Sequence, residues 1–540
     1  MSTLRNKVNL RDFPASDDSA AFALAMDYLR EHPYTTLVVD PGEYTLTSEL
    51  ARETQRAVMA GEYGFNPQRT MFNPKFAYTR GICFAGQKGT RLEAYGVTLM
   101  VDGFMEPVSV RDCEDVTVCG LTIDHKRKPY SRAIITKIES ESEDGKNKVA
   151  IAEFDENSAF IEKTPRFLRS KYYDAVNERE IFPVLEDEDY LDSRHLRLYY
   201  TRAEKLKEGI EYYTVHTYHS RPAVLIENAK NITLEDVTIN SQPGMGVVGN
   251  RSENVTLRRL SVVPSIGHHF STNTDGTHFT SMKGLLRFEN CFFDCQGDDF
   301  VNVHNYYHAI VKREGDCVCY MQEKTPDGTH AQSLDYPDVG DTLELTSRST
   351  MALIDTFKVL ECVPMPDEWM CKVVLDHPLP SDTEDLVLAD VTRLPRVEVI
   401  GCCATCHHAR SILIKTRNVL IENNTFRNVH GSAIHIAPEA SWYEGVSPAD
   451  VVIRGNRIIR CAEDWHDDMG AGIMVYADAD DADNCCIKNI TIEDNFIEVP
   501  YTSHGIYVRN VDGLRIARNK IISQNEPVFV SICENVSIEE

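Results

Sequence analysis

A short sequence unit recurs along most of this 540-residue chain. Each copy begins with a turn residue, continues with alternating apolar positions, reaches Asn, Asp or Gly, and then alternates again. Successive copies start 23 residues apart at Asn231 and Asn254, and 24 residues apart at Asn489 and Gly513. Representative copies are DVTVCGLTID from Asp115, NITLEDVTIN from Asn231, NVLIENNTFR from Asn418, DVVIRGNRII from Asp450 and GLRIARNKII from Gly513.

This repeat predicts an all-β chain built as a right-handed parallel β-helix. Period-two alternation indicates short strands, and a repeat of one coil length means that inward apolar residues are buried only when neighbouring coils stack. The Asn of IENN, IEDN and IARN is expected to recur at one corner, where left-handed backbone geometry and side-chain hydrogen bonding suit it. A leucine-rich horseshoe would need helical or Leu-rich segments, which the repeats lack.

The chain begins with a predicted helix over residues 15–33. Asp17 or Asp18 can cap it, and Phe22, Met26 and Leu29 form part of an apolar stripe. A strand, a Pro-Gly turn and a second strand follow. We interpret this segment as an N-terminal helical cap over the open end of the solenoid, where an exposed sheet edge would promote aggregation.

Two long segments interrupt the repeat and predict inserted domains. Both are rich in alternating strands with charged turns, and each is long enough for a small β-barrel or sandwich. The second leaves the helix directly after His304. The predicted organisation is a cap with the first coils (1–126), a first β-domain (127–220), coils with an acidic stretch (221–305), a second β-domain (306–396) and C-terminal coils (397–540).

Composition narrows the classes of partner. The chain has 83 acidic and 56 basic residues, a net charge of −27, which argues against nucleic acid and favours an uncharged ligand over a polyanion. The first ten residues are not followed by the apolar core of a secretion signal, and no run of 18 apolar residues occurs. The sixteen cysteines are scattered, and without a secretion signal we expect them to be reduced thiols in a cytoplasmic protein. Because no long apolar run occurs, we expect no membrane binding.

The stretch from Asn273 to His304 concentrates carboxylates. An Asn-Thr-Asp-Gly turn holds Asp275, and the adjacent Asp298 and Asp299 follow about one repeat later. We expect Asp275 and Asp298 to project from neighbouring coils, with a turn at Gln296-Gly297 bringing in Asp299. Clustered carboxylates repel, so one should keep its proton near neutrality, which is the arrangement that glycoside hydrolysis uses. The alternatives are ordinary turn residues or a calcium site, which would need further oxygen ligands; we predict neither metal nor cofactor.

These motifs resemble glycoside hydrolase family 110, the α-1,3-galactosidases, within the polygalacturonase-like β-helical glycosidases. The resemblance rests on D-G, then D-D followed by Asn302-x-His304, and on a later GSAIHI with Trp442-x-Glu444. It implies a pectate-lyase-like solenoid with two inserted β-barrels and an inverting mechanism. Asp298 would be the general acid, and Asp275 and Asp299 would activate water. It also makes Asn302, His304, Trp442 and Glu444 candidates for substrate binding.

Other residues extend the candidate site. Arg410 and Lys415 lie in one coil and could bind hydroxyls or tune a carboxylate, although a solvated face is the favoured interpretation of Lys415. The Gly-His-Gly and Arg-x-Lys motifs typical of polygalacturonases are absent, which weakens a pectin substrate. Aromatic Trp442 could stack on a sugar. A weaker second candidate is the loop that contains residues 465–468 (WHDD).

The acidic stretch predicts a glycoside hydrolase, and the resemblance implies that it is exo-acting and inverting. It also implies that the enzyme removes terminal α-linked galactose, mainly α-1,3-linked, from oligosaccharides. The alternatives are another β-helical glycosidase, specific for galacturonides or a different terminal sugar, and a non-catalytic glycan-binding solenoid. The expected partner is a glycan with terminal galactose, and a homodimer is compatible with the exposed faces of a β-helix.

Overall fold

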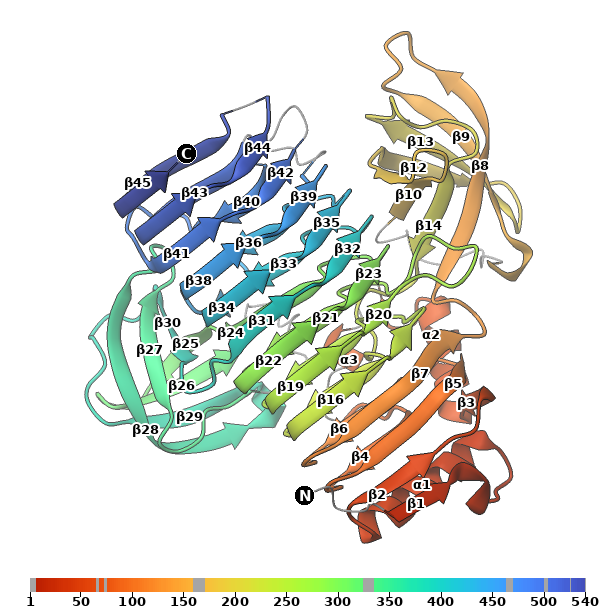
Figure 1. The fold of residues 1–540 in the computed structure, drawn as a ribbon, viewed down its shortest axis with the longest axis horizontal. Coiled ribbons are helices and arrows are strands. Elements are labelled where there is room, and N and C mark those ends of the chain that lie inside the picture. Colours follow the sequence, from red (N-terminus) through yellow and green to blue (C-terminus); the bar gives the residue numbers. More distant parts are fainter. Residues whose placement is uncertain are drawn as a thin grey trace.

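The computed structural model describes residues 6–64, 68–71, 75–158, 170–323, 335–462, 470–499, 504–524 and 526–539. Its body is a right-handed parallel β-helix, along which the chain advances from the N-terminal to the C-terminal coils (Figure 1). The predicted fold class is therefore confirmed. Three sheets run along the helix, and each coil contributes a strand to most of them.

The first sheet carries the candidate site. Its strands pair in parallel from coil to coil in the order β4 (Arg80–Ala85), β6 (Glu106–Arg111), β15 (Val224–Glu227), β18 (Val247–Asn250), β21 (Thr277–Thr280), β24 (Val301–Tyr306), β33 (Ile412–Ile414), β36 (Ile434–Ile436), β40 (Ala471–Val475), β43 (His504–Ala517) and β45 (Val528–Glu539).

The other two sheets close the coil. The second contains β1 (Asn6–Asn9), β2 (Thr35–Val38), β5 (Arg91–Asp102), β7 (Thr117–His125), β16 (Lys230–Glu235), β19 (Glu253–Arg258), β22 (Lys283–Glu289), β31 (Arg396–Ile400), β34 (Arg417–Glu422), β38 (Ala449–Arg454) and β41 (Ile487–Glu493). The third contains β3 (Gly42–Thr47), parts of β5 and β7, β17 (Thr238–Ile239), β20 (Ser261–Val262), β23 (Phe292–Asp294), β32 (Cys403–Thr405), β35 (Thr425–Arg427), β39 (Arg457–Ile459), β42 (Phe496–Glu498) and β44 (Lys520–Ile522).

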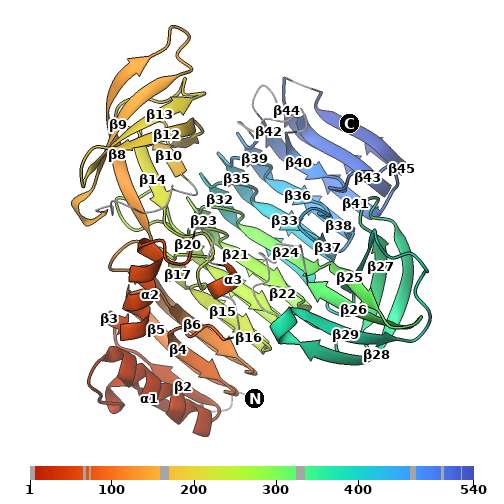
Figure 2. The same ribbon diagram turned by 180° about the vertical axis from the view of Figure 1, so that it is seen from behind.

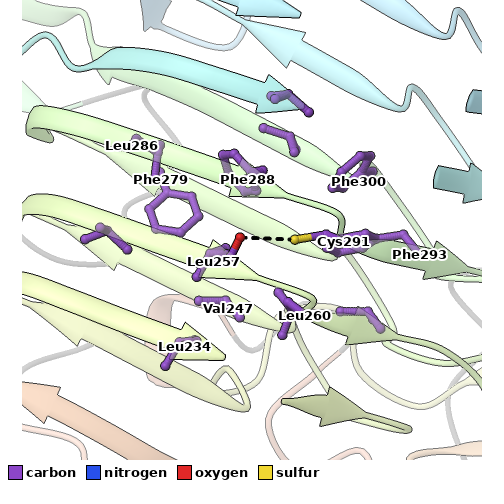
Figure 3. Close-up of a cluster of buried hydrophobic side chains, with 14 of the residues drawn as sticks. Leu234, Val247, Leu257, Leu260, Phe279, Leu286, Phe288, Cys291, Phe293 and Phe300 are labelled. Carbon is purple, nitrogen blue, oxygen red and sulfur yellow. Dashed lines mark hydrogen bonds between the residues drawn. The ribbon is translucent and has the colours of Figure 1, made fainter. Parts of the chain in front are cut away.

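The alternating apolar residues fill the interior of the coils. Behind the candidate site, the Phe293 and Phe300 rings lie 4.0 Å apart, and the Phe279 and Phe288 rings meet edge to face at 5.7 Å (Figure 3). The Cys291 thiol in the same layer donates to the Leu257 carbonyl. Each buried Phe stabilises the fold by roughly 1.5–3 kcal/mol. This aromatic layer supports β21 and β24 from inside, so their outward side chains are held on a rigid sheet.

The recurring Asn predicted at one corner forms a buried hydrogen-bonded ladder. The Asn424 amide donates to Asn456 Oδ1, Asn456 donates to Asn495 Oδ1, and Asn495 donates to Asn519 Oδ1, each at 2.9–3.0 Å. The left-handed residue is the one before each ladder Asn, for example Asn423 (φ 56°). The corner therefore divides the two roles, with one residue turning the backbone and the next binding the neighbouring coils.

The N-terminal helix agrees with the sequence pattern. The helix α1 spans Asp18–Glu31, Asp17 caps it by accepting from the Ala20 amide at 2.9 Å, and Phe22, Ala25, Met26 and Leu29 are its buried residues. The 3-10 turn η1 (Leu10–Asp12) precedes it, and α2 (Glu49–Met59) and α3 (Gln68–Met71) follow β3. Sequence analysis did not predict α2, in which Ser48 caps the first turn by accepting from Ala51 N.

The first insertion is a seven-stranded antiparallel sheet. Its strand order is β11-β10-β14-β8-β9-β13-β12, and its core is a separate apolar cluster that includes Phe154, Leu198 and Tyr212. Its elements are β8 (Tyr130–Glu141), β9 (Lys148–Phe154), η2 (Glu156–Ser158), β10 (Ser170–Asp174), β11 (Arg179–Ile181), β12 (Val184–Tyr190), β13 (His195–Thr201) and β14 (Glu211–Val215).

The second insertion is a closed six-stranded barrel with its own core around Leu343, Phe357 and Val373. Its elements are β25 (His308–Arg313), β26 (Val318–Glu323), β27 (Thr342–Ser347), β28 (Leu353–Met365), η3 (Pro366–Glu368), β29 (Met370–Leu375) and β30 (Leu386–Asp390). The two insertions flank the middle coils, one at each end of the strands β21, β24 and β33 (Figure 2). Among the described residues, no helix has the length and apolar character that a membrane crossing needs.

Candidate active site

The three aspartates lie just before two neighbouring strands of the first sheet. Thr277 on β21 pairs with Val301 on β24, and the Gly276 amide donates to the Asp299 carbonyl at 2.8 Å. Asp275 therefore stands opposite Asp299, about one strand spacing (~4.8 Å) away along the helix. The expectation that Asp275 aligns with Asp298 is wrong by one residue, because the coil between the two strands is 24 residues long rather than 23.

The turns that hold these aspartates depend on close backbone approach. A Cβ on Gly276 would lie 2.5 Å from the Phe293 ring, and a Cβ on Gly297 would lie 2.2 Å from the Asn273 carbonyl oxygen. Gly297 is thus required for space, whereas the left-handed turn residue is Cys295 (φ 57°). The Asn273 amide donates to the Thr217 carbonyl at 2.9 Å, which ties the Asn-Thr-Asp-Gly turn to the exit of the first insertion.

Asp298 and Asp299 differ in surroundings although they are adjacent. Asp298 is half-buried, and its Oδ1 accepts from the Asp299 amide at 3.1 Å. Asp299 is buried and accepts from the backbone amide of Arg410 at 2.8 Å and from its guanidinium at 3.1 and 3.0 Å. Burial raises the pKa of Asp299, and Arg410 opposes that rise. The turn therefore presents one accessible carboxyl beside one that is paired with a fixed cation.

Arg410 and Lys415 bracket β33 and share a carboxylate that the sequence analysis missed. Glu439 accepts from Arg410 Nη1 at 3.1 Å and from Lys415 Nζ at 2.7 Å, and Lys415 also contacts Glu444. Lys415 is 0% exposed, so its interpretation as part of a solvated face is wrong. Burial disfavours the ions, but Lys415 and Arg410 lower the pKa of Glu439 overall. No motif marks Glu439, which reaches the cluster because its backbone pairs with that of Glu444.

A line of buried histidines leads from Asp275 to Glu444. His278 Nδ1 lies 2.8 Å from Asp275 Oδ2, and His278 Nε2 lies 2.8 Å from His304 Nε2. His304 Nε2 is also 3.6 Å from Glu444 Oε1. Burial raises the pKa of Asp275 to about 7, against the opposing effect of the His278 hydrogen bond. His278 follows Asp275 by three residues, and that spacing would have been the only signal for it in the sequence.

Among the described residues, the buried polar atoms without a hydrogen-bond partner include two on outward side chains of the same sheet. They are Asn302 Oδ1 on β24 and His435 Nε2 on β36, and the side chains are 5% and 4% exposed. Leu413 on β33 occupies the register position between them. A buried unpaired polar atom is costly, so these two atoms are candidates for hydrogen bonds to a ligand. His435 was not predicted from the sequence, whereas Asn302 was.

The remaining candidates lie at the margin or outside this cluster. Trp442 belongs to the loop before β37 (Glu444–Gly445) and is 45% exposed, so its ring is open to solvent contact. β37 pairs with the end of β24, which brings this loop to the site. Residues 465–468 lie outside the described residues. Within the described part of the chain, no group of His, Cys, Asp or Glu side chains is arranged to hold a metal ion.

Comparison with known proteins supports both the fold and the resemblance. Residues 410–540 match a sequence family described as "Right handed beta helix region". The chain is 24% identical to α-1,3-galactosidase B of Parabacteroides distasonis, covering 95% of this chain and 87% of that one. It is 27% identical to α-1,3-galactosidase A of Bacteroides fragilis, covering 83% and 76%. The resemblance inferred from the motifs is therefore confirmed over nearly the whole chain, and the chain is a relative of glycoside hydrolases.

Solved structures with a similar course of the chain are more distant. A family 28 exopolygalacturonase of Yersinia enterocolitica is 12% identical with a TM-score of 0.39, covering 99% of this chain and 78% of that one. The mannuronan C-5 epimerase AlgE4 A-module of Azotobacter vinelandii is 11% identical with a TM-score of 0.41, covering 99% and 100%.

Proposed function

We propose that this relative of the α-1,3-galactosidases is an exo-acting glycoside hydrolase that removes terminal α-linked galactose from oligosaccharides with inversion. The observation that carries the proposal is the cluster of Asp275, Asp298 and Asp299 on adjacent coils of one sheet. The names of its relatives supply the sugar and the α-1,3 linkage. Inverting hydrolysis needs one carboxyl that gives a proton to the leaving oxygen and another that takes a proton from water on the opposite face of the sugar.

The surroundings of each aspartate support a division of roles. Asp298 is the most accessible of the three and is assigned as the general acid. Asp299 is held by Arg410 and Asp275 by His278, so both are fixed in place to accept hydrogen bonds from the attacking water. Asn302 Oδ1 and His435 Nε2 are assigned to the sugar hydroxyls, because they are buried polar atoms without partners. Both ring nitrogens of His304 already have partners, His278 and the Asn305 carbonyl. His304 is therefore assigned to hold His278 in place rather than to bind the sugar.

The ion pairs around Arg410 and Lys415 carry a net charge that suits the transition state of this reaction. Arg410 and Lys415 contribute two positive charges, and Asp299, Glu439 and Glu444 contribute three negative charges, which leaves one net negative charge. The transition state of glycoside hydrolysis resembles an oxocarbenium ion and carries positive charge. A preorganised excess of one negative charge in a buried site stabilises that charge more strongly than water does.

The same contacts favour a neutral sugar over a galacturonide. A galacturonide would need a cation available for its carboxylate. Arg410 already binds Asp299 and Glu439, and Lys415 already binds Glu439 and Glu444. Binding a further carboxylate there would require breaking a buried ion pair, which costs several kcal/mol.

The test compares hydrolysis of α-galactosides with hydrolysis of a panel of other terminal glycosides, for the wild type and for Asp298→Asn. The proposal predicts release of galactose by the wild type, loss of turnover in Asp298→Asn, and calorimetric binding of galactosyl-α-1,3-galactose by Asp298→Asn. Asp494→Asn, which changes an exposed aspartate on a distant turn, serves as the control and should retain activity. Unchanged turnover in Asp298→Asn would contradict the assignment. Binding without turnover in the wild type would favour a glycan-binding solenoid.

A further inference from the structure

The histidine line behind Asp275 fixes where protons can reside. Three short contacts follow one another: Asp275 Oδ2 to His278 Nδ1 at 2.8 Å, His278 Nε2 to His304 Nε2 at 2.8 Å, and His304 Nδ1 to the Asn305 carbonyl at 2.9 Å. All three side chains are buried. Each contact needs one hydrogen, so the hydrogens can be assigned from the end of the line.

The carbonyl end of the line determines the tautomer of His304. A carbonyl only accepts, so His304 Nδ1 carries the hydrogen that it donates to Asn305. Burial lowers the pKa of His304 to about 3, so the ring is neutral and its Nε2 has a lone pair. The 2.8 Å contact between the two rings therefore requires His278 to donate from Nε2.

The assignment leaves one proton for the last contact. His278 Nε2 is already protonated, so Nδ1 either holds a second proton or accepts one from Asp275. In the first case His278 is an imidazolium facing a carboxylate, and in the second a neutral ring accepts from a carboxylic acid. Asp275 and His278 thus share a single proton, and only the first arrangement leaves Asp275 able to take a proton from water.

We propose that His278 is a positioning residue that keeps this shared proton on its Nδ1 and so maintains Asp275 as the ionised base, with His304 and the Asn305 carbonyl fixing the orientation of its ring. The inference rests on the proposed function of the site. In the reaction, water forms a bond to the anomeric carbon and gives a proton to Asp275. The glycosidic bond breaks, and its oxygen takes a proton from Asp298.

The charges around His278 favour its imidazolium form, whereas burial and the charges of Asp298 and Asp299 favour a proton on Asp275. The groups that act on the pair from the surrounding elements are Asp298 and Asp299 before β24, Lys415 at the end of β33, and Glu444 in β37, and His304 on β24 contacts His278 directly. Glu444 and Asp275 both favour a positive His278, whereas Lys415 opposes it. The net result is a pKa of His278 above its ordinary value despite burial, which otherwise lowers it.

The inserted barrel contributes to the same line. Asn305, whose carbonyl anchors His304, donates from its side chain to the Asp390 carbonyl at the end of β30. Its backbone also pairs with Gly445 of β37. The contacts of Asn305 with the barrel and with β37 therefore fix the orientation of the histidine line where the β-helix joins the barrel.

The pH dependence of kcat/KM for an α-galactoside tests the proposal. In His278→Asn an amide can still donate to Asp275 but cannot hold the shared proton, so burial raises the pKa of Asp275 with less opposition. The acidic limb of the profile should move upward by more than one pH unit, and activity should recover at alkaline pH. A merely structural role would lower activity by the same factor at every pH, and that result would overturn the proposal. His125→Asn, a buried histidine bonded to Ser241 on another coil, should leave the profile unchanged.

A second measurement separates this proposal from the proposed function. In ¹⁵N-labelled protein, nuclear magnetic resonance should show one buried imidazolium near pH 7 that disappears in His278→Asn. If the wild type hydrolyses no α-galactoside but shows this imidazolium, the proposed function is refuted and the proposal of a shared proton stands. A neutral His278 in an active wild type, throughout the range from about pH 5 to pH 8, would refute the shared proton and retain the function.

Discussion

Replacing Lys415 by Met should destabilise the protein by an amount that depends on pH. The Lys415 ammonium is fully buried between Glu439 and Glu444. Removing one partner of a buried ion pair costs about 3–5 kcal/mol, because an uncompensated charge remains. Met has a similar stem, so the packing of the stem is largely retained. Urea unfolding followed by far-UV circular dichroism measures the difference in free energy of unfolding.

The sign of the pH dependence follows from Glu444. In the wild type its pKa lies below the ordinary value because basic neighbours, Lys415 among them, outweigh burial. Its stabilising contribution is therefore present above the unfolded pKa, about 4.3, and is lost as the pH falls through the folded pKa. In Lys415→Met, burial and the neighbouring Glu439 raise that pKa. Below that raised pKa, folded Lys415→Met binds a proton that the folded wild type does not. The loss in free energy of unfolding caused by the substitution therefore grows with rising pH and is largest above the raised pKa.

The difference in free energy of unfolding between the wild type and Lys415→Met should therefore become smaller as the pH falls, by up to about 1.4 kcal/mol per pH unit for one proton. Lys312→Met removes an exposed lysine paired with Glu314 and should cost less than about 1 kcal/mol at any pH. A Lys415→Met penalty that stays constant between about pH 5 and pH 8 would refute the reasoning. Such a result would mean that lost packing, rather than unpaired buried carboxylates, causes the instability.

Four further substitutions test other contacts in the molecule. Asn456→Ala removes a central member of the Asn ladder and leaves buried backbone groups without partners, so thermal unfolding should show a loss of at least about 1–3 kcal/mol. Asn302→Ala and His435→Ala should each lower kcat/KM for an α-galactoside by roughly tenfold, about 1.4 kcal/mol. Because Asn302 Oδ1 and His435 Nε2 have no protein partner, any loss of thermal stability should come from lost packing, such as the stacking of His435 on Tyr476, rather than from a broken hydrogen bond at these atoms. Arg410→Lys cannot reproduce the fork that binds both oxygens of Asp299, so kcat should fall by at least about tenfold in steady-state assays while the fold is retained.

The β-helix was predictable because its pattern is local. Period-two alternation and the coil-length repeat identify the strands, and a cap such as Asp17 marks the start of α1 within three residues. The helix α2 was missed because its strongly amphipathic sequence follows a strand-like run, and its N-cap, Ser48, lies inside that run. The coil register was misjudged by one residue because strand pairing, rather than the spacing of similar motifs, determines which residues face each other across coils.

The site was only partly predictable for a related reason. Asp275, Asp298 and Asp299 stand in recognisable turns, so their meeting follows from the coil length. Glu439 comes from a later coil and carries no motif, and only the three-dimensional stacking places it beside Arg410. His435 lies within the GSAIHI motif, but the motif alone did not show that its side chain faces outward two coils from Asn302. The burial of Lys415 was also hidden, because an isolated lysine in a strand is usually solvent-facing and its two carboxylate partners lie 24 and 29 residues further along the chain.

Proton nuclear magnetic resonance of the purified protein with galactosyl-α-1,3-galactose tests the central claim most directly. The anomeric signals report which form of galactose is released before mutarotation mixes the two. Single displacement by water, with Asp298 as the acid and Asp275 and Asp299 as the water-activating pair, predicts that β-galactose is released first. Initial release of α-galactose would keep the substrate but contradict inversion and the roles of the three aspartates.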